Sequence, residues 1–279
     1  MMNQEFTGRA AVVTGAGRHG GLGEAIVRRL AGGGCSVVLS DIGRQADEAT
    51  PTAMVGSRSE MDAIAAEIAR ETGSQVESYE CDVRDEAKMR ALADFTASRF
   101  GSLDIWVNNA GIGYIMKPLR EITRSDWQAV IDVNLTGCFN GIQAAIQYMI
   151  PQRIGRIVNI ASQAAKSGFP FAAAYCASKH ALVGLVRSVA IELGAHGITV
   201  NNVCPNHVTT RLGSWQNEYF SKKLGLTMEE YLQQMTGRIP LGRCGRPVDT
   251  ANAVAFLCSE AAGYITAESL NVSGGEEPH

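Results

Sequence analysis

The stretch Arg9–Gly32, RAAVVTGAGRHGGLGEAIVRRLAG, decides the fold. Its apolar start, Arg9–Thr14, predicts a short buried strand, and the residues from about Glu24 to Gly32 predict a helix. The glycines between them let the backbone turn tightly and approach a pyrophosphate, and the start of a helix presents free N–H groups. This order of elements predicts a pyrophosphate-binding loop. A glycine-rich turn with a purely structural role is the alternative.

A carboxylate follows the second predicted strand. Residues 36–40 form an apolar run that ends at Asp41, 18 residues after Gly23. An acid about 20 residues beyond such a loop accepts hydrogen bonds from the adenosine ribose and repels a 2′-phosphate. Asp41 therefore favours NAD over NADP. Arg18 and Arg44 are a contrary signal, because a guanidinium binds phosphate, and a helix-capping role is the alternative for Asp41.

Strands and helices alternate along the rest of the chain. Further strands are expected near residues 76–81, 103–107, 156–161, 199–203 and 269–272. Helices are expected at 61–72, 125–149, 172–193 and 247–259, and another follows Val83 and ends at about residue 100. Residues 43–59 are expected to form a loop. The alternation predicts an α/β fold with a parallel sheet covered on both faces. Without a linker or a repeat, residues 1–279 read as one domain.

Polar residues follow two of these strands. Asp82 and Val83 end one, and the turn Asn108–Gly111 ends another. Ligands of open parallel sheets bind at the carboxyl edge, so these residues are candidates for contact with a cofactor. Capping and turn roles are the alternatives.

The segment Ser162–Lys179, SQAAKSGFPFAAAYCASK, carries the reacting groups. Tyr175 and Lys179 are four residues apart on a predicted helix, so they share one face, and Ser162 ends the preceding strand. A free tyrosine has a pKa of about 10, and a neighbouring ammonium lowers it. The phenol then suits general acid–base work on an alcohol or a carbonyl, with Ser162 bonded to the oxygen. These groups lack a hydride acceptor, so a cofactor is needed.

Two other segments bear on the site. Asn134 lies within the predicted helix 125–149, where its amide competes for backbone hydrogen bonds; it either faces solvent or marks a functional kink. Residues 208–240 carry aromatic side chains after a strand's carboxyl end and read as a lid over an apolar substrate or as an oligomer contact. The candidate substrate residues are Ser162, Gln163, Phe169, Tyr175, His207 and Trp215, with Tyr114 and Tyr219 as further wall residues. For His207, a loop histidine with its hydrogen bonds satisfied is the favoured alternative.

The composition narrows the class of protein. The chain is 46% hydrophobic and 19% charged with a net charge of −3, which is typical of a globular protein and favours neither nucleic acid nor membrane as a partner. It shows no signal peptide and no apolar run near the ~18 residues of a membrane span, so we expect a cytoplasmic protein. The seven cysteines are scattered without metal-binding spacing, which predicts reduced thiols and no metal site.

With these residues in place, the sequence resembles the short-chain dehydrogenase/reductase family in its compact single-domain branch. The resemblance covers nearly the whole chain and rests on Thr14-Gly15 with Gly21 and Gly23, Asp41, Asp82, Asn108–Gly111, Asn134, Ser162, Tyr175-x-x-x-Lys179, Pro205-x-x-Val208-x-Thr210, Pro240–Arg243, Pro247, Phe256-Leu257 and Val272–Gly275. It implies a Rossmann-type doubly wound sheet, NAD(P), hydride transfer between nicotinamide and an alcohol or ketone, and a homodimer or homotetramer.

The resemblance also implies residue roles. Tyr175 is the general acid/base, Lys179 lowers its pKa and holds the nicotinamide ribose, Ser162 polarises the carbonyl, and Asn134 supports a proton-relay water. The implied cofactor contacts are Gly15, Arg18, Gly21, Leu22, Gly23, Asp41, Ile42, Asp82, Val83, Asn109, Ala110, Gly111, Tyr175, Lys179, Pro205, Val208 and Thr210.

Three features depart from the family pattern. Five residues separate Gly15 from Gly21, where the family has three, and Asn206 and Ala267 replace usual glycines. None of these departures removes a reacting group. The sequence therefore predicts an NAD-dependent oxidoreductase acting on a secondary alcohol or ketone, and the candidate substrate residues suggest a cyclic or aromatic alcohol. An NADP-dependent 3-oxoacyl reductase is the alternative, and a non-catalytic NAD-binding sensor is a second one.

Overall fold

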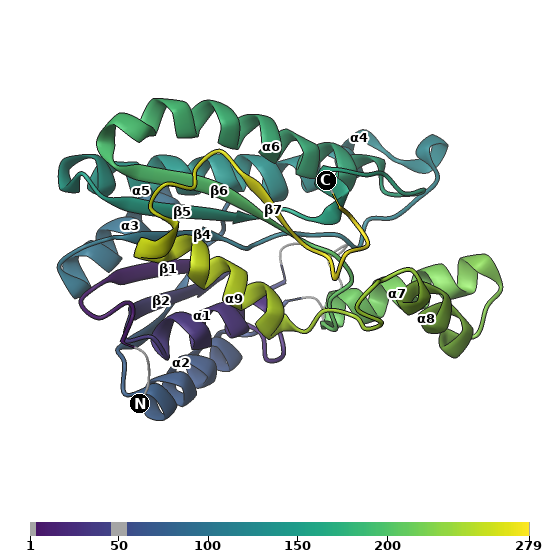
Figure 1. Cartoon of the computed structure of the whole chain (residues 1–279), viewed down its shortest axis with the longest axis horizontal. Helices are drawn as coiled ribbons and strands as arrows, with labels where there is room; N and C mark the ends of the chain where they lie inside the picture. Colours follow the sequence, from purple (N-terminus) through teal and green to yellow (C-terminus); the bar gives the residue numbers. More distant parts are fainter. Residues whose placement is uncertain (1–3, 46–54, 279) are drawn as a thin grey trace.

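A computed structural model describes residues 4–45 and 55–278, and it is built around one parallel sheet (Figure 1). The strands are β1 (Ala10–Thr14), β2 (Ser36–Asp41), β3 (Val76–Glu80), β4 (Ile105–Asn108), β5 (Gly155–Ile160), β6 (Ile198–Pro205) and β7 (Ser269–Val272). They lie in the order β3-β2-β1-β4-β5-β6-β7. The predicted α/β fold with a doubly wound parallel sheet is confirmed.

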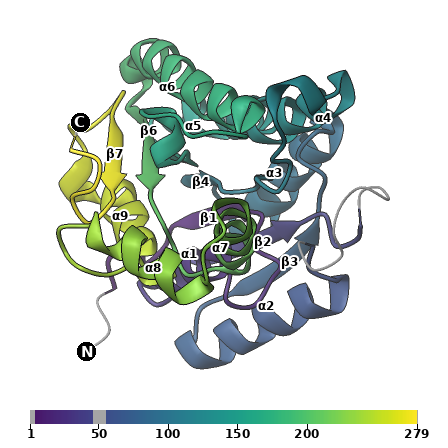
Figure 2. The same ribbon diagram turned by 90° about the vertical axis from the view of Figure 1, so that its right-hand side faces the viewer.

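Helices cover both faces of the sheet. They are α1 (Leu22–Ala31), α2 (Arg58–Thr72), α3 (Glu86–Phe100), α4 (Arg124–Ile131), α5 (Gly137–Gln152), α6 (Ala173–Leu193), α7 (Arg211–Leu224), α8 (Met228–Gly237) and α9 (Pro247–Cys258). One core cluster joins α1, α2 and α9 to the sheet, and a second joins α3, α5 and α6 to its other face (Figures 1 and 2).

Successive side chains of β1 pack alternately into these two cores. Val13 is fully buried against the α1 side, whereas its neighbour Val12 is fully buried against the α3 side. Successive strand residues point to opposite faces, and both faces of this sheet are covered, so the strand is a continuous apolar run.

The order of the strands creates a crevice between β1 and β4. The chain runs outward from β1 to β3, returns to β4 beside β1, and continues outward to β7. At the carboxyl ends, Asn109 Nδ2 donates to the carbonyls of Thr14 (2.9 Å) and Gly15 (2.8 Å), joining the two loops. In sheets of this kind, ligands bind at this reversal.

A row of buried asparagines crosses the same half of the sheet. Asn108 Nδ2 donates to Asn159 Oδ1 (2.8 Å), and Asn159 Nδ2 donates to Asn202 Oδ1 (3.2 Å). Each side chain is at most 2% exposed. Buried amides require partners, and these satisfy one another across β4, β5 and β6. Sequence reasoning did not find this row.

Some elements differ from the expectation. The helix predicted over 125–149 is interrupted by a π-helical segment, Asp132–Thr136, between α4 and α5. The aromatic-rich region after β6 forms two helices, α7 and α8, which lie beyond the carboxyl ends of the strands (Figure 2). Part of the loop predicted at 43–59 lies outside the described residues.

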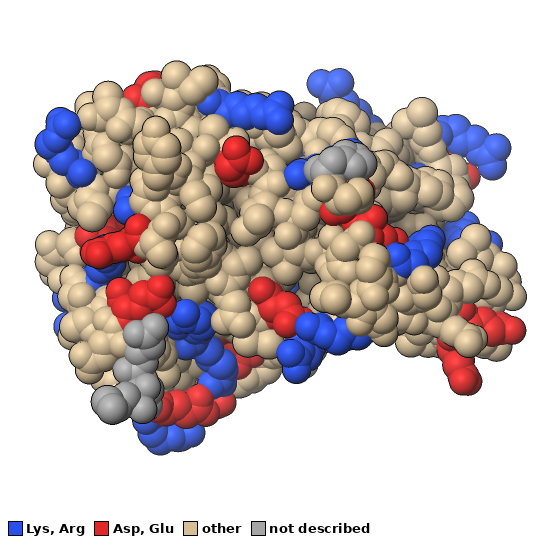
Figure 3. Space-filling model, in the orientation of Figure 1, with Lys and Arg blue, Asp and Glu red and all other residues tan. Residues whose placement is uncertain are grey.

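The surface carries mixed charges. On the face in Figure 3, basic and acidic side chains lie close together over mostly uncharged surface. Ion pairs of the described residues include Arg9–Glu260 (3.0 Å) and Arg243–Asp249 (2.6 Å). No helix within the described ranges is long and apolar enough to cross a membrane.

The seven cysteines are free thiols, and five of them are buried. Burial raises the pKa of the Cys138 thiol to about 11 and that of Cys258 to about 12. These thiols behave as small apolar side chains of the core.

Candidate active site

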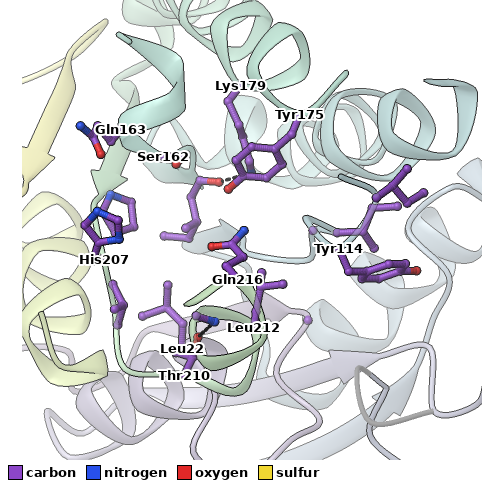
Figure 4. Close-up of a pocket in the computed structure, with 18 of the residues that line it drawn as sticks. Leu22, Tyr114, Ser162, Gln163, Tyr175, Lys179, His207, Thr210, Leu212 and Gln216 are labelled. Carbon is purple, nitrogen blue, oxygen red and sulfur yellow. Dashed lines mark hydrogen bonds between the residues drawn. The ribbon is translucent and has the colours of Figure 1, made fainter. Parts of the chain in front are cut away.

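A cavity of about 880 Å³ lies at the carboxyl edge of the sheet. It extends from the glycine loop before α1, past the ends of β2 and β4, to the start of α6 and the inner face of α7. Figure 4 shows Tyr175 and Lys179 above this space, with Leu212 and Gln216 of α7 below. One continuous cavity therefore joins the predicted cofactor residues to the predicted reacting groups.

The glycine loop is packed too closely for side chains. A Cβ on Gly15 would lie 2.5 Å from Ala110 Cα, and one on Gly23 would lie 2.6 Å from the Gly15 carbonyl oxygen. Gly15 also has a φ of 66°, which favours glycine. These contacts bring β1, α1 and the turn after β4 together and leave the backbone open to the cavity.

The two extra residues of the loop form a tight turn. Gly21 N–H donates to the Arg18 carbonyl (3.2 Å), and Gly20 has a φ of 68°. Two carboxylates hold this turn, because Gly20 N–H donates to Glu24 (2.6 Å) and His19 N–H donates to Glu60 (3.0 Å). The insertion is thus an ordered part of the loop.

Asp41 is fixed at the end of β2 by backbone donors. Its carboxylate accepts from Gly17 N–H (2.9 Å) and from Ile42 N–H (2.8 Å). A Cβ on Gly17 would lie 2.6 Å from Asp41 Cβ, so this contact requires glycine. Burial raises the pKa of Asp41, while the two backbone hydrogen bonds and the charge of Arg18 act in the opposite direction.

The residues of this end fit a dinucleotide. The first turn of α1 opens on the cavity, and its N-cap, Gly21, has no side-chain capping bond, so N–H groups there are available to a phosphate. Asp41 faces the same cavity. Among the predicted cofactor residues, all but Gly23 line it. Gly23 does not line the cavity, and it packs against the backbone of Gly15 in the same loop.

The predicted reacting groups meet on the opposite wall. Ser162 follows β5, and its hydroxyl shares a hydrogen bond with the Tyr175 phenol. Lys179 Nζ lies 5.7 Å from the centre of the Tyr175 ring and donates to the Ile160 carbonyl (2.8 Å). Lys179 is only 4% exposed, and its ammonium has two further donors. The three side chains form one cluster within the cavity.

The pKa of Tyr175 differs from the sequence expectation. Burial raises the pKa of this phenol, and the Ser162 hydrogen bond lowers it without cancelling the effect of burial. Burial also lowers the pKa of Lys179. Lys179 is not among the groups that shift this pKa: its ammonium lies 5.7 Å from the centre of the phenol ring and bonds the Ile160 carbonyl.

Asn134 occupies the π-helical segment and is fully buried. Its Oδ1 accepts from Ile112 N–H (2.8 Å), and its Nδ2 donates to the Ile112 carbonyl (3.0 Å) and to Ser178 Oγ (3.2 Å). The solvent-facing alternative is therefore wrong, and a π-helical segment interrupts the helix at this residue. The amide braces the loop after β4 against α6, and it does not line the cavity.

The far end of the cavity is largely aromatic. Phe169 lies 6.4 Å from the Tyr175 ring and 6.0 Å from Phe220 of α7. Of the predicted substrate residues, Ser162, Gln163, Phe169, Tyr175 and His207 line the cavity. Trp215 does not, because its indole stacks on Tyr219 at 5.6 Å, on another side of α7.

Sequence reasoning missed a polar cluster at the base of the lid. Glu276, after β7, accepts a hydrogen bond from Asn206 Nδ2, lies 3.3 Å from Arg238 Nε and lies 3.8 Å from His207 Nε2. Burial lowers the pKa of His207, although Glu276 opposes this. The only hint in the sequence was Asn206 at a position where the family has glycine.

Comparisons with known proteins agree with this architecture. The family model described as enoyl-(acyl carrier protein) reductase, a short-chain dehydrogenase type, matches residues 15–277. A curated 3-oxoacyl-(acyl-carrier-protein) reductase from Staphylococcus aureus (strain Mu50) is 36% identical over 96% of this chain and 97% of its own.

Solved structures of both cofactor types resemble the chain. Carveol dehydrogenase from Mycobacterium avium, in complex with NAD, has a TM-score of 0.89 at 29% identity, covering 98% of each chain. A single-substitution variant of actinorhodin polyketide ketoreductase with NADPH has a TM-score of 0.87 at 34% identity, covering 100% of each chain.

The chain belongs to the short-chain dehydrogenase/reductase family. It is an NAD(P)-dependent oxidoreductase of that family, with a cavity that joins a dinucleotide-type loop to a serine, a tyrosine and a lysine.

Proposed function

We propose that the protein is an NAD-dependent dehydrogenase that interconverts a secondary alcohol and its ketone, with a cyclic or aromatic body on the substrate. The observation that carries this proposal is the anchored carboxylate of Asp41 in the same cavity as Ser162, Tyr175 and Lys179. The aromatic wall formed by Phe169 and Phe220 supports an apolar substrate.

The reacting groups divide the proton chemistry between them. In alcohol oxidation, Tyr175 as the phenolate takes the proton of the substrate hydroxyl, and the carbon that bears this hydroxyl loses a hydride, so a ketone forms. A bound nicotinamide supplies the hydride acceptor. Ser162 hydrogen-bonds the substrate oxygen, and Lys179, whose ammonium keeps two donors beyond its bond to the Ile160 carbonyl, holds the nicotinamide ribose. Asn134 is a positioning residue, because it acts through Ile112 and Ser178.

The preference for NAD follows from the charge of Asp41. Its Oδ2 is occupied by Gly17 N–H and its Oδ1 by Ile42 N–H, so the carboxylate cannot swing aside without losing both bonds. A carboxylate has further lone pairs for ribose hydroxyls, and a 2′-phosphate there would meet like charge. Arg18 lines the same region and supports the rival proposal, an NADP-dependent 3-oxoacyl reductase.

The two helices after β6 support the proposal that residues 208–240 form a lid over the substrate. Leu212, Gln216 and Phe220 of α7 line the cavity, and Tyr231 and Met235 of α8 line it from the adjoining helix. Burial of the substrate under these helices would exclude water from the reacting end.

A kinetic comparison of the two cofactors tests the proposal. The purified protein is assayed with a panel of cyclic and aryl ketones, with NADH and NADPH at matched concentrations, by following the absorbance of the reduced nicotinamide. We expect kcat/KM with NADH to exceed that with NADPH by at least about tenfold, the effect of one charged contact. Equal rates, or a preference for NADPH together with turnover of 3-oxoacyl thioesters, would favour the rival.

A further inference from the structure

Two of the cations on the cavity wall form ion pairs with neighbouring carboxylates. Arg84 is paired with Asp82 (2.6 Å), and Arg238 is paired with Glu276 (3.3 Å). Lys223, in the last turn of α7, also lines the cavity. Among the ion pairs of the described residues, none within 4.0 Å includes Lys223; its neighbour Lys222 bonds Glu218 (2.7 Å) instead.

The position of Lys223 is set by the pocket-facing side of α7. Leu212, Gln216, Phe220 and Lys223 line the cavity, at helical spacings of four, four and three residues. Lys223 Nζ stands 5.9 Å from the centre of the Phe171 ring and 5.8 Å from that of Tyr219. A cation over aromatic faces is held in place while its charge remains available.

Lys223 lies about two helical turns along α7 from Gln216, the residue of this helix that marks the reacting groups. Gln216 marks the near end, because its Nε2 donates to the Gly113 carbonyl (3.2 Å), and a Cβ on Gly113 would lie 3.2 Å from the Tyr175 ring. Seven residues of helix separate Gln216 from Lys223, which is a rise of about 10 Å. Between them the wall carries the aromatic rings of Phe169 and Phe220, with Asn217 as a polar neighbour.

We propose that Lys223 is a specificity-determining residue that selects substrates with an apolar body and an anionic group, a carboxylate or a phosphate, about 10 Å from the reacting carbonyl. The inference rests on the proposed function and specifies its substrate class. The cation of Lys223 meets the anion at the open rim, while the aromatic wall holds the apolar body between this anion and Tyr175.

A role in helix stability is the competing explanation. Cations in the last turn of a helix interact favourably with its dipole, and both Lys222 and Lys223 lie there. That role predicts equal effects on stability from either lysine and no effect on substrate charge. Lys222, in the same turn but absent from the cavity wall, is therefore a matched control.

The test compares acids with neutral analogues. We would measure kcat/KM for 4-acetylphenyl-alkanoic acids of increasing chain length and for their methyl esters, with wild type, Lys223→Met and Lys222→Met. The expected result is a preference of the wild type for the acid. The acid-to-ester ratio falls about tenfold in Lys223→Met and stays within about twofold in Lys222→Met. The preference should also weaken at high salt, because the ammonium is exposed.

A second pair of substrates distinguishes the two sources of the anion. A 3-oxoacyl coenzyme A carries phosphates beyond the thioester, whereas the 3-oxoacyl N-acetylcysteamine thioester is neutral. A loss confined to the coenzyme A substrate in Lys223→Met indicates phosphate. A loss confined to the keto acids indicates carboxylate.

A binding measurement keeps the two proposals separate. Calorimetry with 4-phenylbutanoate and its methyl ester, which cannot react, should show tighter binding of the acid to the wild type and an acid-specific loss in Lys223→Met. Equal losses for acid and ester, or equal effects of both lysine variants, would overturn the inference about Lys223. Acid-specific binding without turnover of any ketone would instead count against the proposed function alone.

Discussion

The two ends of the cavity are built by different means. The dinucleotide end consists of backbone and tightly packed glycines at the edge of the sheet, with Asp41 held by Gly17 N–H. The substrate end consists of side chains from separate segments, including Phe169, Phe220 and Glu276. In the proposed function, the first end recognises a shared cofactor through local geometry, and the second recognises a particular substrate through long-range packing. Changes at the two ends should therefore have different consequences.

The largest effect is expected where the two ends meet. Tyr175→Phe removes the hydroxyl that exchanges a proton with the substrate, so kcat should fall by about 10²–10⁴-fold. Dinucleotide affinity, measured by calorimetry, should stay within a fewfold of wild type. Cys176→Ala is the control, since that thiol is not part of the cavity wall. Near-normal turnover of the phenylalanine variant would remove Tyr175 from the mechanism.

A smaller effect is expected at the dinucleotide end. Asp41→Ala removes the charge that opposes a 2′-phosphate and an acceptor for the ribose hydroxyls. The NADH-to-NADPH ratio of kcat/KM should fall by about 10–100-fold, the range of one or two charged hydrogen bonds. Asp82→Ala, assayed in parallel, should not reverse the preference. An unchanged ratio in Asp41→Ala would mean that another residue reads the ribose.

Two glycines of the loop distinguish the effect of a steric clash from the effect of a strained backbone conformation. Gly15 and Gly20 both have positive φ, but a Cβ on Gly15 would collide with Ala110, whereas one on Gly20 would meet nothing within 4 Å. Gly15→Ala should cost about 1–3 kcal/mol more than Gly20→Ala, seen as a Tm lower by several degrees. Equal Tm values for the two variants would show that the loop relaxes around the added methyl group.

The smallest effect concerns pH at the substrate end. Burial holds the pKa of His207 below its usual value of about 6.5, and the charges facing it are Glu276 and Arg238. His207 therefore binds a proton more readily in the unfolded chain than in the folded one. Its contribution to the free energy of unfolding is fully present above pH ~6.5 and is lost as the pH falls toward the lower pKa of the folded state. Thermal unfolding between about pH 7.5 and 5.5, a window that spans the unfolded value, should therefore show a steeper loss in wild type than in His207→Gln. If Tm depends on pH in the same way in wild type and in His207→Gln, the pH dependence of stability comes from other groups.

Sequence reasoning brought together residues that line one cavity in the structure, for a physical reason. Gly15, Asp41 and the segment from Ser162 to Lys179 are local patterns, in which spacing along one strand or helix determines which side chains face together. The doubly wound sheet follows from the alternation of such elements, and the structure confirms it.

The substrate end was less accessible because its contacts join distant segments. Glu276 meets Asn206 across 70 residues, and no local pattern indicates such a pair. The aromatic ring of Trp215 predicts a substrate-wall residue, but the direction in which the ring points depends on how α7 docks. The raised pKa of Tyr175 likewise depends on burial, which sequence spacing does not give.

The most direct test of the central claim is a crystal structure of the protein with NAD⁺ bound. Our account predicts that the adenosine ribose hydroxyls bond to Asp41 and that the nicotinamide ring lies in the cavity beside Tyr175, with Lys179 close to its ribose. A nicotinamide placed outside this cavity, or an adenosine ribose without contact to Asp41, would contradict it.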